Sequence, residues 1–212
     1  MQDELTVRGI VLTVTQLGEY DKRLVVLTEQ LGKITVFANG ARRKNSRFAA
    51  VTQSFTMGSF TVRPGKNTYT LCEAVLERSF LDLTMDVEQY ASASYCCELM
   101  DYFTREGVGG KDELNLLYMA FLALLSGTPG AKAVRAAFAI KLLDIEGEMP
   151  RETEAAAVQY VLSCPISKTF LFRAGEDSVK QLEQSAKKEL NRVMDYPLRS
   201  EAILQSLEKL KP

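Results

Sequence analysis

The sequence predicts an α+β protein made of a five-stranded OB-type β-barrel over residues 1–80 and an all-α helical domain over residues 81–212. Five short apolar runs, each bounded by turn residues, fall within the first part. From about residue 81 the apolar residues recur at helical spacing instead. The charge also changes sign: residues 1–80 carry 11 Lys and Arg against 7 Asp and Glu, whereas residues 81–212 carry 15 against 20. A net positive first part favours a polyanion as its partner.

The first three strands are predicted at residues 5–16, 22–28 and 33–38. The first run alternates with period two and carries apolar side chains on both faces, as expected of a strand that closes a barrel. Gly9 permits the bend that such a strand requires. The other two runs are rich in β-branched residues, and the four residues between them predict a hairpin.

Two more strands are predicted at residues 55–63 and 69–76, with a turn at residues 64–67 between them. Gly58 indicates a bulge or a bend within the fourth strand. Five short strands with a long connection after the third are typical of a small Greek-key barrel of the OB type. An SH3-like barrel is the main alternative.

The second part is predicted to be helical throughout. The ranges with a helical period are 87–103, 114–125, 128–147, 152–163, 178–193 and 198–210. Thr128 and Pro129 fit an N-cap followed by the first helical position. Ser178 with Gln181 fits a capping box.

The composition argues against an enzyme. The chain contains no histidine, which removes the Ser-His-Asp and Cys-His arrangements of many nucleophilic enzymes. It also lacks the glycine motifs that bind nucleotide phosphates. The four cysteines, Cys72, Cys96, Cys97 and Cys164, have no C-x-x-C spacing. We therefore expect no zinc or other metal, no cofactor and no catalytic residues.

The chain is also predicted to stay away from membranes. No apolar run is long enough to span a bilayer. The first four residues include two acidic side chains and lack the basic start of a secretory signal. We expect a cytoplasmic protein.

Residues 39–47 contain four cations and no acidic residue. In OB barrels that bind single strands, a basic groove follows the phosphates and aromatic side chains stack on the bases. The candidate DNA-binding residues are the cations of this segment, of the second strand and of the last barrel turn: Arg42, Arg43, Lys44, Arg47, Lys22, Arg23 and Lys66. Strand aromatics are Phe37, Phe55, Phe60 and Tyr69, of which we expect at least half to fill the core. An RNA-binding barrel and a protein-interaction adaptor with a merely solvated basic loop stay open as alternatives.

Several segments of the sequence form a recognisable set. In the first part these are G-I-V-L at 9–12, G-E-Y-D-K-R-L-V-V-L-T-E at 18–29, L-G-K-I-T-V-F-A-N-G-A-R-R at 31–43, S-R at 46–47 and N-T-Y-T-L-C-E-A at 67–74. In the second part they are S-Y-C-C-E-L at 94–99 and R-A-A-F-A-I-K-L-L at 135–143. Together these segments resemble the RecO family of bacterial DNA repair proteins, and the segments of the first part are the more specific.

The resemblance implies a non-catalytic, nucleoid-associated recombination mediator. Such proteins bind single- and double-stranded DNA, anneal strands coated with single-strand-binding protein, and help to load RecA together with RecR. Arg42, Arg43 and Arg47 fall on the basic loop of the family.

The resemblance also concerns the helical domain. In the family this domain can hold the acidic C-terminal tail of single-strand-binding protein, for which Arg135, Phe138 and Lys141 are the candidates here. Many relatives carry a four-cysteine zinc module after the pattern L-L-x-x-x-G-x-x-P. Residues 142–150 match that pattern and the chain then continues directly into a predicted helix. We therefore expect the zinc module to be absent.

Overall fold

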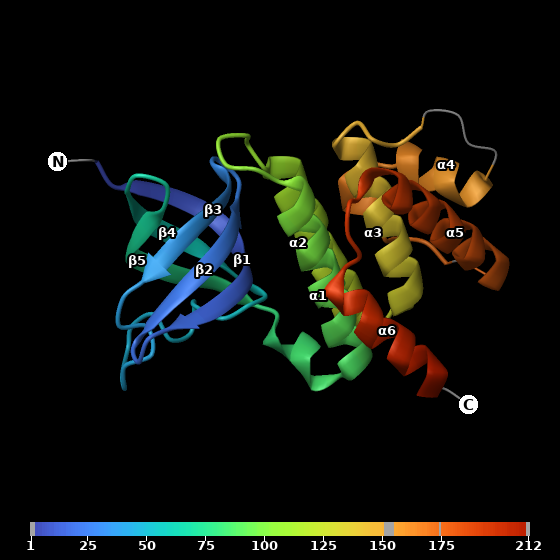
Figure 1. Cartoon of the computed structure of the whole chain (residues 1–212). Helices are drawn as coiled ribbons and strands as arrows, with labels where there is room; N and C mark the ends of the chain where they lie inside the picture. The colour runs from blue at the N-terminus through green and yellow to red at the C-terminus, as the bar shows by residue number, and fades with distance from the viewer. Residues whose placement is uncertain (1–2, 151–154, 174, 211–212) are drawn as a thin grey trace. The chain divides into compact units, whose positions relative to one another are not determined.

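The computed structural model describes residues 3–150, 155–173 and 175–210 (Figure 1). The chain divides into two compact units. One consists of Met1–Asp82 with Met100–Leu114, and the other of Leu83–Leu99 with Asn115–Pro212.

The first unit is built around a closed barrel of five strands. They are β1 (Leu5–Leu17), β2 (Asp21–Thr28), β3 (Gly32–Ala38), β4 (Thr56–Pro64) and β5 (Tyr69–Ser79). The strand order is β1-β2-β3-β5-β4, and every pair is antiparallel except the short parallel contact of β3 with β5. This confirms the predicted five-stranded barrel of the OB type.

Two glycines allow β1 to cross its neighbours closely. Gly9 and Gly58 are direct partners in the β1–β4 ladder. A Cβ atom on Gly9 would lie 2.5 Å from the carbonyl oxygen of Leu27, and one on Gly58 would lie 2.5 Å from that of Val75. Because both positions exclude a side chain, the strands can bend tightly enough for the barrel to close. The β4–β5 register also shifts at Gly58, as the sequence predicted.

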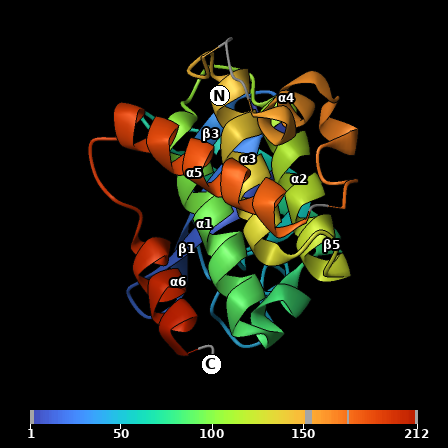
Figure 2. The same cartoon turned by 90° about the vertical axis from the view of Figure 1, so that its right-hand side faces the viewer.

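The second unit is helical, and the predicted order of helices is confirmed. Over the described residues the α-helices are α1 (Val87–Phe103), α2 (Lys111–Ser126), α3 (Ala131–Ile145), α4 (Ala156–Ser163), α5 (Glu176–Val193) and α6 (Arg199–Leu210), with short 3-10 helices η1 (Leu81–Met85) and η2 (Ile166–Lys168). The ends of α1 and α2 at residues 100–103 and 111–114 belong to the barrel unit. Helix α3 packs against α4 and α5 (Figure 2).

Two predicted helix starts are wrong. Helix α3 begins at Ala131 with Gly130 as its N-cap, two residues beyond the predicted N-cap Thr128 and first helical residue Pro129. Helix α5 begins at Glu176 after Gly175, so Ser178 lies inside its first turn and does not cap it. The predicted start of the fourth helix, residues 152–154, falls outside the described residues.

None of the described helices is long and apolar enough to cross a membrane. Within the same residues, no group of three or more Cys, Asp or Glu side chains is placed to hold a metal ion. All four cysteines are free, and Cys96 and Cys97 are buried in α1 as small apolar residues.

Candidate nucleic-acid interface

The connection between β3 and β4, residues 39–55, is called the basic loop below. Its backbone forms a succession of tight turns. The Arg43 amide donates to the carbonyl oxygen of Gly40 at 3.1 Å, and the Ser46 amide donates to that of Arg43 at 3.0 Å. Gly40 and Asn45 adopt left-handed backbone conformations with φ of 69° and 67°. The chain reverses at these positions because glycine and asparagine tolerate this conformation best.

Three apolar side chains fix the basic loop to the barrel. Ala41, Phe48 and Val51 are buried and belong to the same core cluster as Leu24 and Phe60 of the strands. Burying a side chain of the size of Phe48 or Val51 contributes on the order of 1.5–3 kcal/mol. The basic loop therefore closes one end of the barrel as an ordered segment, and its charged residues are left on the outside.

The four cations of the basic loop point to solvent. Arg42, Arg43, Lys44 and Arg47 are all exposed. In the part of the chain that the structure describes, none of them forms an ion pair with a carboxylate. Their positive charges are therefore not cancelled locally, and they remain available to an anion.

Two guanidinium groups are nevertheless held in place. Arg42 Nη1 donates to the Gly18 carbonyl oxygen at 3.1 Å, and Arg47 Nη2 donates to that of Cys72 at 2.7 Å. Arg47 also lies 4.8 Å from the ring centre of Phe48. Carbonyl oxygens and aromatic rings orient a guanidinium without neutralising it. Each group keeps further N–H donors free for phosphate oxygens.

Lys22 is bound differently from the loop cations. Its Nζ donates to Thr52 in the basic loop, at 2.7 Å to the carbonyl oxygen and 3.3 Å to Oγ1. Burial lowers the pKa of Lys22, and the nearby charge of Arg42 lowers it further. The ammonium group thus binds the loop backbone, and we assign it to positioning the basic loop.

Arg23 and Lys66 lie outside the basic loop. Arg23 is exposed on β2 and pairs in register with Phe37 of β3, one residue from the end of that strand. Lys66 is exposed in the β4–β5 turn, which lies at the opposite end of the barrel from the basic loop (Figure 1). The structure therefore groups Arg42, Arg43, Lys44 and Arg47 with Lys22 beneath them, and it separates Lys66 from the group.

Two of the four aromatics predicted on strands are core residues, which agrees with the expected share of at least half, although Phe55 lies in the basic loop directly before β4. Phe55 and Phe60 are buried, with 3% and 0% exposure. Phe37 and Tyr69 are half-buried, and the Tyr69 hydroxyl donates to Glu106 Oε1 at 2.9 Å. Sequence reasoning missed Tyr20, which is 45% exposed in the β1–β2 turn. The signal that could have identified it is an aromatic residue within a predicted turn, where no core is available to bury it.

In the helical unit, Arg135 lines a cavity of about 220 Å³ together with Tyr95, Leu190, Glu201 and Leu204. The side chain is 8% exposed, and its Nη1 donates to the Ser92 hydroxyl at 2.7 Å. Lys132 and Lys187 also line this cavity.

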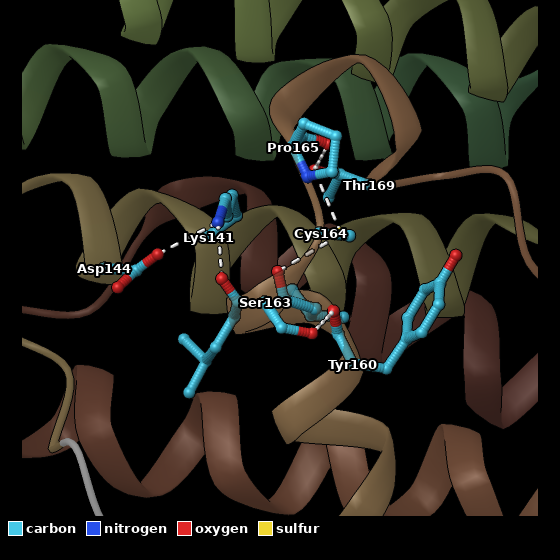
Figure 3. Close-up of polar contacts among 9 residues, drawn as sticks. Lys141, Asp144, Tyr160, Ser163, Cys164, Pro165 and Thr169 are labelled. Carbon is cyan, nitrogen blue, oxygen red and sulfur yellow. Dashed lines mark hydrogen bonds and ion pairs between the residues drawn. The ribbon is translucent and has the colours of Figure 1, made fainter.

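The other two candidates on α3 are buried within the helical unit. Phe138 has no exposed surface. Lys141 is 7% exposed, and its Nζ donates to Asp144 Oδ2 at 3.0 Å and to the Leu162 carbonyl oxygen at 2.9 Å (Figure 3). Of the three candidates for tail binding, Arg135 is the one that lines the 220 Å³ cavity.

Comparison with known proteins matches both parts of the chain to one family. The family model described as recombination protein O N terminal matches residues 1–80, and that described as recombination protein O C terminal matches residues 85–163. Among curated proteins, the DNA repair protein RecO of Clostridium acetobutylicum is 31% identical over 140 residues, which is 66% of this chain and 57% of that protein.

Two further relatives carry the same name. The RecO protein of Alkaliphilus metalliredigens is 31% identical over 149 residues, 70% of this chain and 61% of that protein. That of Listeria monocytogenes is 42% identical over 98 residues, 46% of this chain and 38% of that protein. The match thus spans less than two thirds of the length of each of these relatives. The two family matches and the relatives together show that the chain belongs to the RecO family of DNA repair and recombination proteins.

Proposed function

We propose that this chain is a non-catalytic DNA-binding protein of recombinational repair whose basic loop binds the DNA backbone. The observation that carries the proposal is the state of the loop cations. Arg42, Arg43, Lys44 and Arg47 are exposed on an anchored segment, and among the described residues no carboxylate pairs with them.

The proposed binding is electrostatic. Each cation that neutralises a phosphate releases a condensed counterion from DNA, so the affinity falls as salt rises. Four contacts on single-stranded DNA give a slope of log K against log salt of about −2.8, which is roughly a 50-fold loss between 50 and 200 mM salt. The loop binds the backbone that both single and double strands share, so both are proposed ligands.

Membership of the RecO family supports a more specific proposal about the activity of the chain. The chain would anneal complementary strands coated with single-strand-binding protein, and would help RecR to load RecA. In this proposal the barrel of residues 1–80 binds DNA, and the helical domain of residues 81–212 binds protein partners. The name of the relatives refers to DNA repair alone, so each of these steps is part of the proposal.

The cavity beside Arg135 is the proposed site for the acidic tail of single-strand-binding protein. A guanidinium next to the apolar side chains of Leu190 and Leu204 suits an acidic tail that ends in an aromatic residue. Two acidic residues, Glu183 and Glu201, also line the cavity. Their charges would restrict binding to tails whose carboxylates reach Arg135 or the two flanking lysines.

Annealing provides the functional test. We expect the purified protein to accelerate the pairing of complementary strands coated with single-strand-binding protein, and Arg42→Ala/Arg43→Ala to lose most of this acceleration. Lys66→Ala removes an exposed cation at the other end of the barrel and serves as the control. If the wild-type protein binds no oligonucleotide at low salt, the protein-interaction adaptor is the better account. If a matched RNA strand displaces DNA efficiently, the RNA-binding alternative is favoured.

A further inference from the structure

Tyr20 is the exposed aromatic residue of the barrel. Among the described aromatic residues of residues 3–82, Phe48, Phe55, Phe60 and Phe80 are buried, and Phe37 and Tyr69 are half-buried. Tyr20 alone in that range is exposed, at 45% of its surface. When a flat partner covers a large apolar ring that was in contact with water, the free energy falls, so binding is favoured.

The turn that carries Tyr20 is joined to the basic loop. The Arg42 amide donates to the Tyr20 carbonyl oxygen at 2.8 Å, and Arg42 Nη1 donates to that of Gly18 at 3.1 Å. On the next residue, Asp21 Oδ1 accepts a hydrogen bond of 2.7 Å from the Gly40 amide. These three bonds make the turn and the start of the basic loop one surface.

The ring itself is oriented by two neighbours. The Tyr20 hydroxyl donates to Glu19 Oε1 at 2.7 Å, and this bond raises the pKa of Tyr20. The Arg43 guanidinium carbon lies 5.5 Å from the ring centre. An arginine over one part of an aromatic ring adds a second flat group on which a base can stack.

We propose that Tyr20 and Arg43 form a stacking subsite for an unpaired nucleobase. The inference deepens the proposed function and rests on it, because the phosphates bound by the basic loop are what would bring a base to Tyr20. Bases within a duplex are covered on both faces by their neighbours and cannot offer a free face to a side chain. The subsite therefore selects single strands, whereas the loop cations bind single and double strands alike.

The test uses two probes that differ in their bases: an oligothymidine and an abasic strand of the same length and phosphate number. Tyr20→Ala is expected to bind oligothymidine about 5- to 150-fold more weakly than the wild-type protein does. Its affinity for the abasic strand and for duplex DNA is expected to be unchanged. Tyr20→Phe keeps the ring and is expected to bind all three probes as the wild-type protein does.

Salt titration separates this inference from the proposed function. Tyr20→Ala is expected to keep the wild-type salt slope, because stacking releases no counterions. Unchanged affinity of Tyr20→Ala for oligothymidine overturns the stacking subsite, and so does an equal loss on oligothymidine and the abasic strand. In either case the proposed function stands, provided that Arg42→Ala/Arg43→Ala still reduces the salt slope. Failure of the wild-type protein to bind any of the probes overturns both.

Discussion

The basic loop and helix α3 contain the same kinds of cationic side chain in opposite surroundings. Arg42 and Arg43 of the loop are exposed and have no carboxylate partner among the described residues. Arg135 and Lys141 of α3 are 8% and 7% exposed. One Arg135 nitrogen donates to the Ser92 hydroxyl, and the Lys141 ammonium group donates to Asp144 and to the Leu162 carbonyl oxygen. The sequence therefore does not show which cations can bind a ligand, because this depends on how exposed each side chain is and on which groups of the protein already bind it.

The difference has a physical cause. Removing a charge from water costs several kcal/mol, so a buried cation persists only where hydrogen bonds and charges inside the protein replace its hydration. The cations of α3 meet this condition through Ser92, Asp144 and the Leu162 carbonyl oxygen. The cations of the loop keep their hydration and can exchange it for phosphate.

The largest expected effect is on DNA affinity. At 50 mM salt, two phosphate contacts to a single strand contribute roughly 60-fold to the binding constant. Arg42→Ala/Arg43→Ala should lose about this factor, as measured by fluorescence anisotropy with a labelled oligothymidine. Its thermal unfolding should match that of the wild-type protein because both side chains are exposed. A large loss of stability in this variant would mean that these arginines support the fold in the way that the buried cations of α3 do.

Lys141→Met should show the converse pattern. The substitution removes the buried donor to the Leu162 carbonyl oxygen and to Asp144. An unsatisfied buried acceptor costs about 1–3 kcal/mol, which urea unfolding would measure. Oligothymidine affinity should stay at the wild-type value. Weaker DNA binding by a well-folded Lys141→Met protein would break the distinction between the two regions.

Lys22→Met tests a cation between these two extremes. Losing the bond from Lys22 to Thr52 should lower the free energy of unfolding by about 1 kcal/mol. The salt slope of DNA binding should stay near its wild-type value, because the ammonium group is bound to the loop and not to phosphate. A slope reduced by about 0.7 would instead identify Lys22 as a phosphate contact.

The smallest effect concerns Glu201, which lines the cavity beside Arg135. Burial raises the pKa of Glu201 above its ordinary value of 4.5, Lys187 opposes this shift, and Glu98 adds to it. A carboxyl group with a raised folded-state pKa favours folding in its protonated form. Its stabilising contribution is present below about pH 4.5 and is lost as the pH rises through the folded-state pKa.

Glu201→Gln should remove this loss. The stability of the variant relative to the wild-type protein should therefore increase as the pH rises above 4.5, as followed by thermal unfolding at several pH values. Parallel pH profiles for the two proteins would show that Glu201 is not perturbed by its surroundings.

The barrel was predicted well from local sequence patterns, because alternating apolar residues mark the strands and glycines within them mark where the strands bend. Each of the five strands lies within three residues of its predicted ends, and the tight crossing at Gly9 and Gly58 follows from the absence of side chains there. Helix starts were less predictable. The N-caps of α3 and α5 are glycines, which cannot make a side-chain capping bond, so the sequence shows no capping motif at these two helix starts.

The candidate site was predicted in part, for a related reason. The charge of the basic loop is visible in one continuous segment. The contact of Lys22 with Thr52 and the position of Lys66 at the far end of the barrel depend on how the strands pair, which residue spacing does not reveal. Phe138 and Lys141 were misleading because α3 is buried over most of its length, so no polar face marks which side chains reach the surface.

The central claim is that the exposed cations of the basic loop bind phosphates, and the salt dependence of single-strand binding tests it most directly. Oligothymidine affinity would be measured from 50 to 200 mM salt for the wild-type protein and for Arg42→Ala/Arg43→Ala. The account predicts a slope near −2.8 for the wild-type protein and near −1.4 for the variant, that is, about 50-fold and about sevenfold losses over this range. Equal slopes for the two proteins would contradict it.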